Sequence, residues 1–161
     1  RPLQLIVENL PGLVELSVSI AAHSLDDNQF TNESARIIGN LQHLRQLRIG
    51  IANLSVGWSQ IGDEAAYRLA EMPTLESLSI GMTYWISEST NVTEEGLKVL
   101  CRKLQLRELN ISKPRYDTDG NTYADSVAVA IARNLPGLVV LQANLNNFGS
   151  EAMKPISSGL L

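Results

Sequence analysis

The sequence is poor in the side chains that most often carry catalysis or bind metals. Its 161 residues include one cysteine, Cys101, and two histidines, His23 and His43. Zinc sites usually need three or four such ligands at short, regular spacings, which these residues do not provide. No nucleophile elbow, phosphate-binding loop or paired catalytic carboxylates are present either. We therefore expect no metal, no cofactor and no enzymatic activity.

The single cysteine also bears on the cellular compartment. One cysteine cannot form an intramolecular disulfide, which favours a reducing, cytoplasmic location without excluding secretion. Four N-x-Ser/Thr sequons point weakly the other way, toward a secreted protein. They begin at Asn32, Asn53, Asn91 and Asn110. Asn110 falls on an expected strand, which would make it a poor glycan acceptor, so the compartment stays open.

Positive charge and long apolar runs are scarce as well. The chain has 13 Lys and Arg against 17 Asp and Glu, a net charge of -4. Because a nucleic-acid binder normally carries a basic excess, we expect no nucleic-acid partner. No apolar run approaches the roughly 20 residues that span a bilayer, so we expect no membrane insertion. No secretory signal is present, and because the sequence opens at Arg1 without methionine we expect a processed or trimmed start.

A six-residue pattern, Leu-x-x-Leu-x-Val/Ile, recurs along the chain. Its successive steps are 31, 31, 31 and 32 residues, and the fifth copy ends in Ala143 instead of Val or Ile. Self-similarity at one fixed period is typical of stacked-repeat proteins, in which each unit buries its apolar face against its neighbours. The leading residues are Leu13, Leu44, Leu75, Leu106 and Leu138.

Each copy predicts a strand followed by a helix. The second leucine and the Val or Ile are two residues apart, so they share one face of a strand, which the stack must bury. We expect the second leucines to form one buried spine, with Leu47, Leu78, Leu109 and Leu141 almost fully buried. A bulky apolar residue then precedes Thr, Asp or Ser cap candidates and acidic residues, as at a helix start. Nine residues after that apolar residue comes a small side chain, and Cys101 occupies this position in its repeat. We therefore expect Cys101 to be a buried structural thiol and not a nucleophile.

These repeats resemble those of leucine-rich-repeat proteins of the ribonuclease-inhibitor-like class. The segment 61–70 followed by 75–80 is similar to the GALA repeats of bacterial effectors and to the repeats of NOD-like receptors. The resemblance implies an α/β solenoid of five strand-helix repeats of about 31 residues, with a parallel concave sheet and convex helices. It covers residues 1–161 as a single domain. Because neither end shows the polar outer face of a capping repeat, we expect a segment of a longer chain.

The sequence departs from that family at the corner after each strand. The family pattern places Asn eight residues after the first leucine, where its amide bonds to the backbone. Here only Asn146 complies, and the other four positions are Ala21, Ala52, Thr83 and Pro114. We therefore expect the corner to be hydrogen-bonded in another way.

Four repeats carry a seven-residue insertion at one place. The first leucine and the helix-opening residue are 17 residues apart in repeats one to four and 10 apart in the fifth. Stacking would gather the insertions 19–29, 50–60, 81–91 and 112–122 into a rim. Large aromatic and Arg side chains there could bind a partner, or fold inward to anchor their own loops, and the Trp and Tyr could also stack on a carbohydrate. The candidate rim residues are Trp58, Tyr84, Trp85, Arg115 and Tyr116.

The sheet is the second candidate surface, because alternate strand residues point away from the core. Arg45, Arg48 and Arg107 could form a basic patch there. Nearby carboxylates could instead neutralise it as a solvated, salt-bridged face. These are Glu15, Glu76 and Glu108.

The function expected from these features is recognition of another protein. The chain could be the sensing or target-recognition part of a larger receptor or effector. A structural or self-associating solenoid segment is the alternative, ahead of a carbohydrate-binding variant and of an enzyme.

Overall fold

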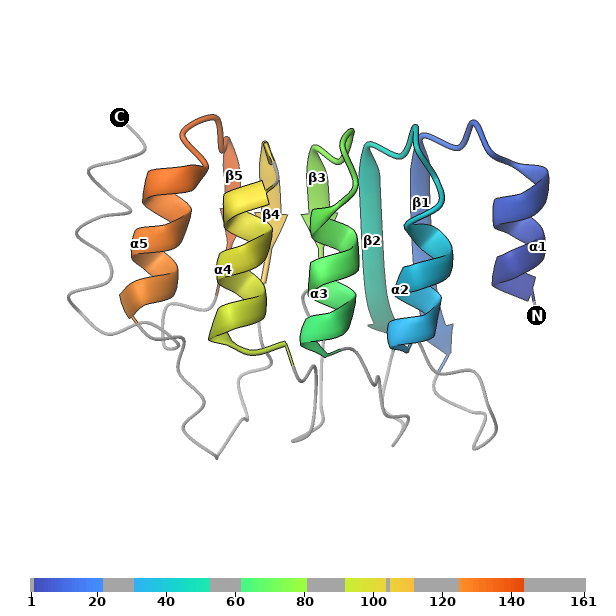
Figure 1. The fold of residues 1–161 in the computed structure, drawn as a ribbon, viewed down its shortest axis with the longest axis horizontal. Coiled ribbons are helices and arrows are strands. Elements are labelled where there is room, and N and C mark those ends of the chain that lie inside the picture. The colour runs from blue at the N-terminus through green and yellow to red at the C-terminus, as the bar shows by residue number, and fades with distance from the viewer. Residues whose placement is uncertain are drawn as a thin grey trace.

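The computed structural model describes residues 2–21, 31–52, 62–80, 92–103, 105–111 and 125–143. Within them, helices and strands alternate strictly, and the strands form one parallel sheet in the order β1-β2-β3-β4-β5 (Figure 1). The helices are α1 (Pro2–Asn9), α2 (Asn32–Ile38), α3 (Asp63–Ala70), α4 (Glu94–Lys103) and α5 (Asp125–Asn134). The strands are β1 (Glu15–Ala21), β2 (Gln46–Ala52), β3 (Ser77–Ser79), β4 (Glu108–Asn110) and β5 (Val140–Gln142).

The 31-residue period of the sequence sets the register of neighbouring strands. Paired residues on neighbouring strands are 31 apart, or 32 between β4 and β5, as in Leu16↔Leu47 and Leu109↔Leu141. At each strand entry one carbonyl accepts two consecutive N–H groups of the next strand. The Val14 carbonyl, for example, accepts from Arg45 and Gln46 at 2.8 and 3.1 Å. The carbonyls of Arg45, Glu76 and Arg107 repeat this arrangement.

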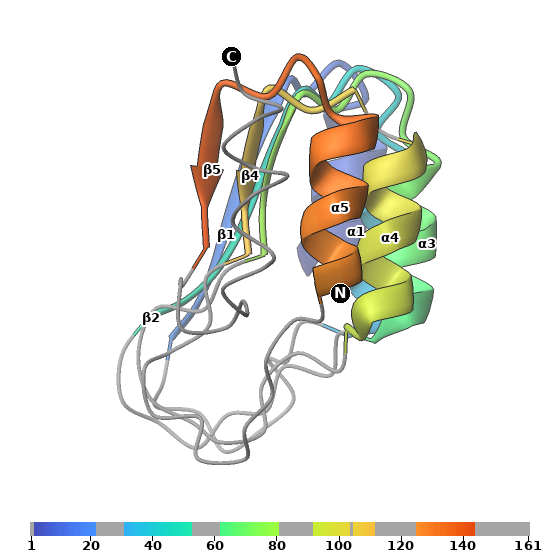
Figure 2. The same ribbon diagram turned by 90° about the vertical axis from the view of Figure 1, so that its left-hand side faces the viewer.

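The core lies between the sheet and the helices, which form two layers (Figure 2). Leu47, Leu78 and Leu109 are fully buried in one spine, as predicted. Leu141, the next member, was predicted to be buried as well, but it is only partly buried. It belongs to β5, the last described strand, so only β4 covers it among the described strands.

The α1–β1 end of the stack is apolar and partly open. Residues 2–9 form a helix, and Val7 joins the core. Leu10 is 52% exposed, whereas Leu41, its equivalent in the next repeat, is 1% exposed. Leu16 and Val18 are only half-buried. The difference arises because no described element packs on the outer side of α1 and β1 (Figure 1).

Two strands are longer than the repeat pattern requires. β1 and β2 have seven residues each, while β3, β4 and β5 have three. Residues 19–21 and 50–52, which we expected to open the first two insertions, are therefore strand. The remainder of the four insertions lies outside the described residues.

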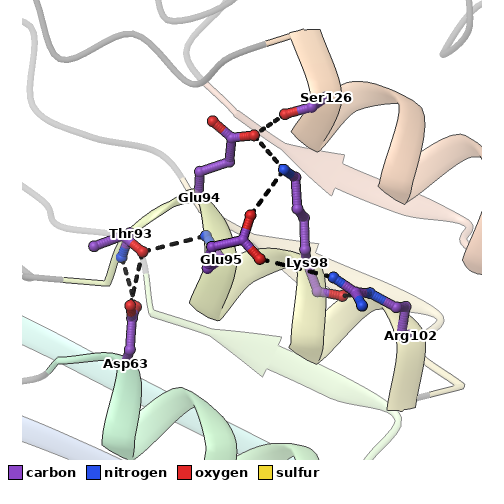
Figure 3. A network of polar contacts seen from close by, with 7 residues as sticks. All are labelled: Asp63, Thr93, Glu94, Glu95, Lys98, Arg102 and Ser126. Carbon is purple, nitrogen blue, oxygen red and sulfur yellow. Dashed lines mark hydrogen bonds and ion pairs between the residues drawn. The ribbon is translucent and has the colours of Figure 1, made fainter.

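Hydrogen bonds link the helix start of one repeat to that of the next. Asp63 was a cap candidate for its own helix, but Gly62 is the N-cap of α3. The Asp63 carboxylate instead accepts hydrogen bonds from the next repeat, from the Thr93 N–H and the Thr93 hydroxyl, both at 2.7 Å (Figure 3). The α2 N-cap, in contrast, is the expected one, with Thr31 and Ser34 forming a reciprocal capping box.

Equivalent contacts occur 31 residues before and after Asp63. The Asn32 Oδ1 accepts from the Gly62 N–H at 2.9 Å, and the Glu94 carboxylate accepts from the Ser126 hydroxyl. We call Asn32, Asp63 and Glu94 the helix-start ladder. Asn32 and Asp63 accept from backbone N–H groups at the start of the next helix, and Glu94 accepts from a side-chain hydroxyl, so each contact fixes one helix against the next.

Gly96 makes room for this ladder. A Cβ at residue 96 would lie 2.3 Å from the Asp63 Oδ1 and 3.1 Å from the Val92 side chain. A side chain at residue 96 would therefore displace the Asp63 carboxylate from its place beside Thr93.

Truncation of the leucine spine should be far more costly inside the stack than at its open end. We expect Leu78→Ala to lower the free energy of unfolding by about 2–5 kcal/mol, because it leaves a cavity between two neighbouring repeats. Leu10→Ala should cost less than about 1.5 kcal/mol, since half of that side chain is already in water. Urea denaturation of the two variants checks this, and equal losses would contradict the observed repeat alignment.

Substitution of Gly96 should destabilise the protein although alanine is the better helix former by about 1 kcal/mol. The matched control is Gly39→Ala, because Gly39 has right-handed helical φ and ψ and its added Cβ would meet only carbonyl oxygens at 3.4 Å. We expect Gly96→Ala to melt lower than the parent, and Gly39→Ala to melt at the same temperature or higher.

A double substitution isolates the cause. In an Asp63→Ala background the carboxylate is gone, so Gly96→Ala should cost much less than in the parent chain. An unchanged cost would show that the Asp63 contact is not what excludes a side chain at residue 96.

Candidate functional site

The face of the sheet turned away from the helices is the best-defined candidate surface (Figure 2). Two rows of alternate residues cross it, because successive strand side chains point to opposite faces. All but Val140 are polar, and all but Ser77 are exposed or half-exposed. The rows are Glu15, Gln46, Ser77, Glu108 and Val140, and Ser17, Arg48, Ser79, Asn110 and Gln142.

Two contacts between adjacent strands engage charged groups on this side. The Ser77 hydroxyl donates to the Glu108 Oε2 at 2.9 Å, from β3 to β4. Arg45 and Glu76, at the entries of β2 and β3, form an ion pair at 3.2 Å. The expected salt-bridged face therefore exists for Arg45, and the three arginines do not form one unpaired patch.

Arg48 and Arg107 differ from Arg45. Both are exposed, and neither side chain forms an ion pair or hydrogen bond within the described part of the chain. Arg48 lies in the middle of β2, paired in register with Ser17 of β1 and Ser79 of β3. Among the described residues, its guanidinium is thus the central unpaired cation of the sheet, bordered by short side chains.

The five predicted rim residues lie outside the described part of the chain. They are Trp58, Tyr84, Trp85, Arg115 and Tyr116. Their role in partner binding stays a prediction.

Charges on the helix side are largely paired with neighbours. Arg36 bonds to Glu33, Arg68 to Glu71, and Arg102 to Glu95. Arg133 is the one arginine of the described helices without such a pair. The helix side is therefore mostly neutralised within the chain, in contrast to the region around Arg48.

The strongest helix-side pairing surrounds Lys98, which contacts both Glu94 and Glu95 (Figure 3). Hydrogen bonds from Lys98 and from the Ser126 hydroxyl lower the pKa of Glu94 below its usual value. Hydrogen bonds to Glu94 and then Glu95 raise the pKa of Lys98. The sequence alone did not predict this network, although the 31-residue spacing of Asn32, Asp63 and Glu94 was a visible signal.

Cys101 is a buried free thiol, as its column in the repeat predicted. Burial raises its pKa to about 12, and the nearby positive charge of Arg102 offsets this only in part. The thiol is therefore protonated near neutral pH, where a nucleophilic cysteine would need to be a thiolate.

Neither a metal cluster nor a membrane-spanning helix occurs among the described residues. No group of three or more His, Cys, Asp or Glu side chains there is arranged to hold a metal ion. None of the described helices combines the length and apolar character needed to cross a membrane.

Comparison with known proteins establishes the fold. No protein-family model and no curated protein sequence matches the chain. Among solved structures, it is similar to the tropomodulin C-terminal domain of Caenorhabditis elegans, with 19% sequence identity and a TM-score of 0.58. The likeness covers 99% of this chain and 89% of that one.

The prediction of an α/β leucine-rich-repeat solenoid is therefore confirmed, with parallel strands on one side and helices on the other. At this level of identity the likeness shows the fold alone. The fifth repeat contributes β5, and its expected helix lies outside the described residues.

The Glu94–Lys98 pair should give the protein a stability that depends on pH. Because the pKa of Glu94 is lowered on folding, its contribution is present above the ordinary value of 4.5 and is lost as the pH falls through the folded value. Because the pKa of Lys98 is raised on folding, the contribution of Lys98 is present below its ordinary pKa of 10.5 and is lost as the pH rises through the folded value.

Glu94→Gln should therefore melt below the parent at pH 7, and this difference should shrink toward pH 3. A difference that is constant across the range would contradict the pairing.

Proposed function

We propose that this chain is a scaffold that recognises another protein through the sheet face and the adjoining rim. The observation that carries the proposal is the open, polar sheet face itself. Its rows of short and polar side chains are held in register by the strand-entry hydrogen bonds, while the opposite face of the same strands is buried in the core. A rigid face with adaptable polar side chains suits an extended macromolecular contact.

The shape of the surface favours a protein over a small molecule. Neighbouring parallel strands lie about 4.8 Å apart, so five strands offer a broad, nearly regular array of contact positions. Tyr, Trp and Arg dominate the energetics of protein interfaces, and the rim sequences contain all three. We also propose that the chain belongs to the ribonuclease-inhibitor-like class and that it is the recognition part of a receptor or effector. The helix between each pair of strands supports the assignment to that class.

Self-association is the second candidate function, and the open α1–β1 end favours it. Leu10 is 52% exposed at this end, and Leu16 and Val18 are only half-buried there, whereas their equivalents in the next repeat are buried. Burial of these side chains against a second copy would remove apolar surface from water. Light scattering after size-exclusion chromatography distinguishes this role, because a self-associating chain shows a mass that rises with concentration.

The absence of enzymatic activity is also a proposal. Cys101 supports it, since the one thiol of the chain is buried and protonated near neutral pH. Carbohydrate binding by the rim tryptophans stays a less favoured variant. An activity screen and a glycan array on the intact chain test these two alternatives.

Affinity capture with matched variants tests the main proposal. The intact chain, Arg48→Glu and the helix-side control Arg133→Glu are immobilised and exposed to an extract of the source cells. We expect one set of proteins to be retained by the parent and by Arg133→Glu but not by Arg48→Glu, because only Arg48 lies on the sheet face. Melting temperatures of the three chains should agree, which excludes loss of fold as the cause.

The rim is tested in the same assay with Trp58→Ala and Trp85→Ala. If either residue is part of the interface, its removal should weaken binding by on the order of 1 kcal/mol or more without lowering the melting temperature. Identical captured proteins for every sheet and rim variant would reject recognition by these surfaces.

A further inference from the structure

We propose that the sheet face selects an acidic segment of its protein partner, with Arg48 as the anchor for one carboxylate. The inference rests on the proposed function and names the chemistry of the partner. It is carried by the position of Arg48 and by the pairing of the charges around it.

The position of Arg48 leaves its guanidinium accessible from above the sheet. The register places Ser17 and Ser79 on either side, and these side chains are too short to screen it. Along β2, the neighbours on the same face are Gln46 and Gly50. A carboxylate that approaches the sheet face here can accept two parallel N–H hydrogen bonds from the Arg48 guanidinium. This is the geometry in which arginine binds carboxylates most strongly.

The charges nearby do not already satisfy Arg48. Glu76 is paired with Arg45 at 3.2 Å, and Glu108 accepts from Ser77 at 2.9 Å. Glu15 is the remaining carboxylate of the two rows, opposite Gln46 in the register, and it forms no ion pair with Arg48. Glu15 weakens the long-range field of the arginine, so selection depends on direct pairing at contact distance.

Arg107 supplies a second cation without a partner in the described part of the chain, at the entry of β4, two strands from Arg48. Two strand spacings correspond to about 10 Å across the sheet, and Arg107 precedes Asn110, the residue in register with Arg48, by three residues, about 10 Å along the strand. The two Cα atoms are therefore about 14 Å apart. A partner segment that crosses the strands can therefore meet both arginines with carboxylates a few residues apart. The pattern expected of the partner is two acidic residues separated by a short polar or small-residue spacer.

Selection from a random displayed-peptide library tests this even though the partner is unidentified. The intact chain and its Arg48→Gln variant are used in parallel as bait, with Arg133→Gln as the matched helix-side control. We expect the parent and the Arg133→Gln chain to enrich peptides rich in Asp and Glu, and Arg48→Gln to lose them. A synthetic copy of an enriched peptide should bind Arg48→Gln about tenfold or more weakly, and Arg107→Gln by a smaller factor.

Two further measurements distinguish loss of the ion pair between Arg48 and the peptide from a general disruption of the sheet face. Arg48→Lys should restore part of the affinity, because it retains the charge but not the bidentate geometry. Added salt should weaken peptide binding to the parent more than to Arg48→Gln.

The outcomes are decisive in both directions. Enrichment of acidic peptides that depend on Arg48 supports the inference. Peptides without acidic residues, or acidic peptides that bind Arg48→Gln equally well, overturn it while leaving recognition by the sheet face intact. A library that yields no enriched peptide also overturns it, and the proposed function then depends on the capture of folded proteins alone.

Discussion

Burial of leucine between neighbouring repeats is the constraint on which the rest of the structure depends. No single strand-helix unit can remove its own apolar face from water, so each repeat is stable only against the next. Leu47, Leu78 and Leu109 meet this requirement on the inner side of the sheet. Because that side is committed to the core, the other side is free to carry polar residues, and the candidate binding surface is a direct result of the packing.

Two hydrogen-bond systems run along the stack and fix the same repeat distance from opposite sides. One is the backbone system at the strand entries, where each carbonyl accepts two N–H groups of the next strand. The other is the helix-start ladder, where a side chain at a helix start accepts from the following repeat. The first is independent of side-chain identity and tolerates varied residues at the surface. The second depends on particular residues, and Asp63 with Gly96 is its most demanding pair.

The fold and the core could be predicted from the sequence because both follow from the spacing of apolar residues. The burial of Cys101 followed in the same way, from its place in a column of small side chains. The role of Asp63 could not be predicted, because a carboxylate at a helix start can reach donors of its own helix or of the next repeat. The partial burial of Leu141 follows from its place on β5, which pairs with β4 alone among the described strands. The contrast between Arg45, which is paired, and Arg48, which is not, depends on side-chain geometry that the repeat lattice does not specify.

The burial of Cys101 has a consequence for how opening of the stack can be observed. A thiol held inside the protein reacts with a soluble reagent only during excursions that admit water, so its labelling rate reports the population of opened molecules. Since the chain contains no other cysteine, the signal arises from α4 alone. The labelling rate of Cys101 therefore reports how often the central repeats separate, and a ligand that bridges several strands would lower this rate.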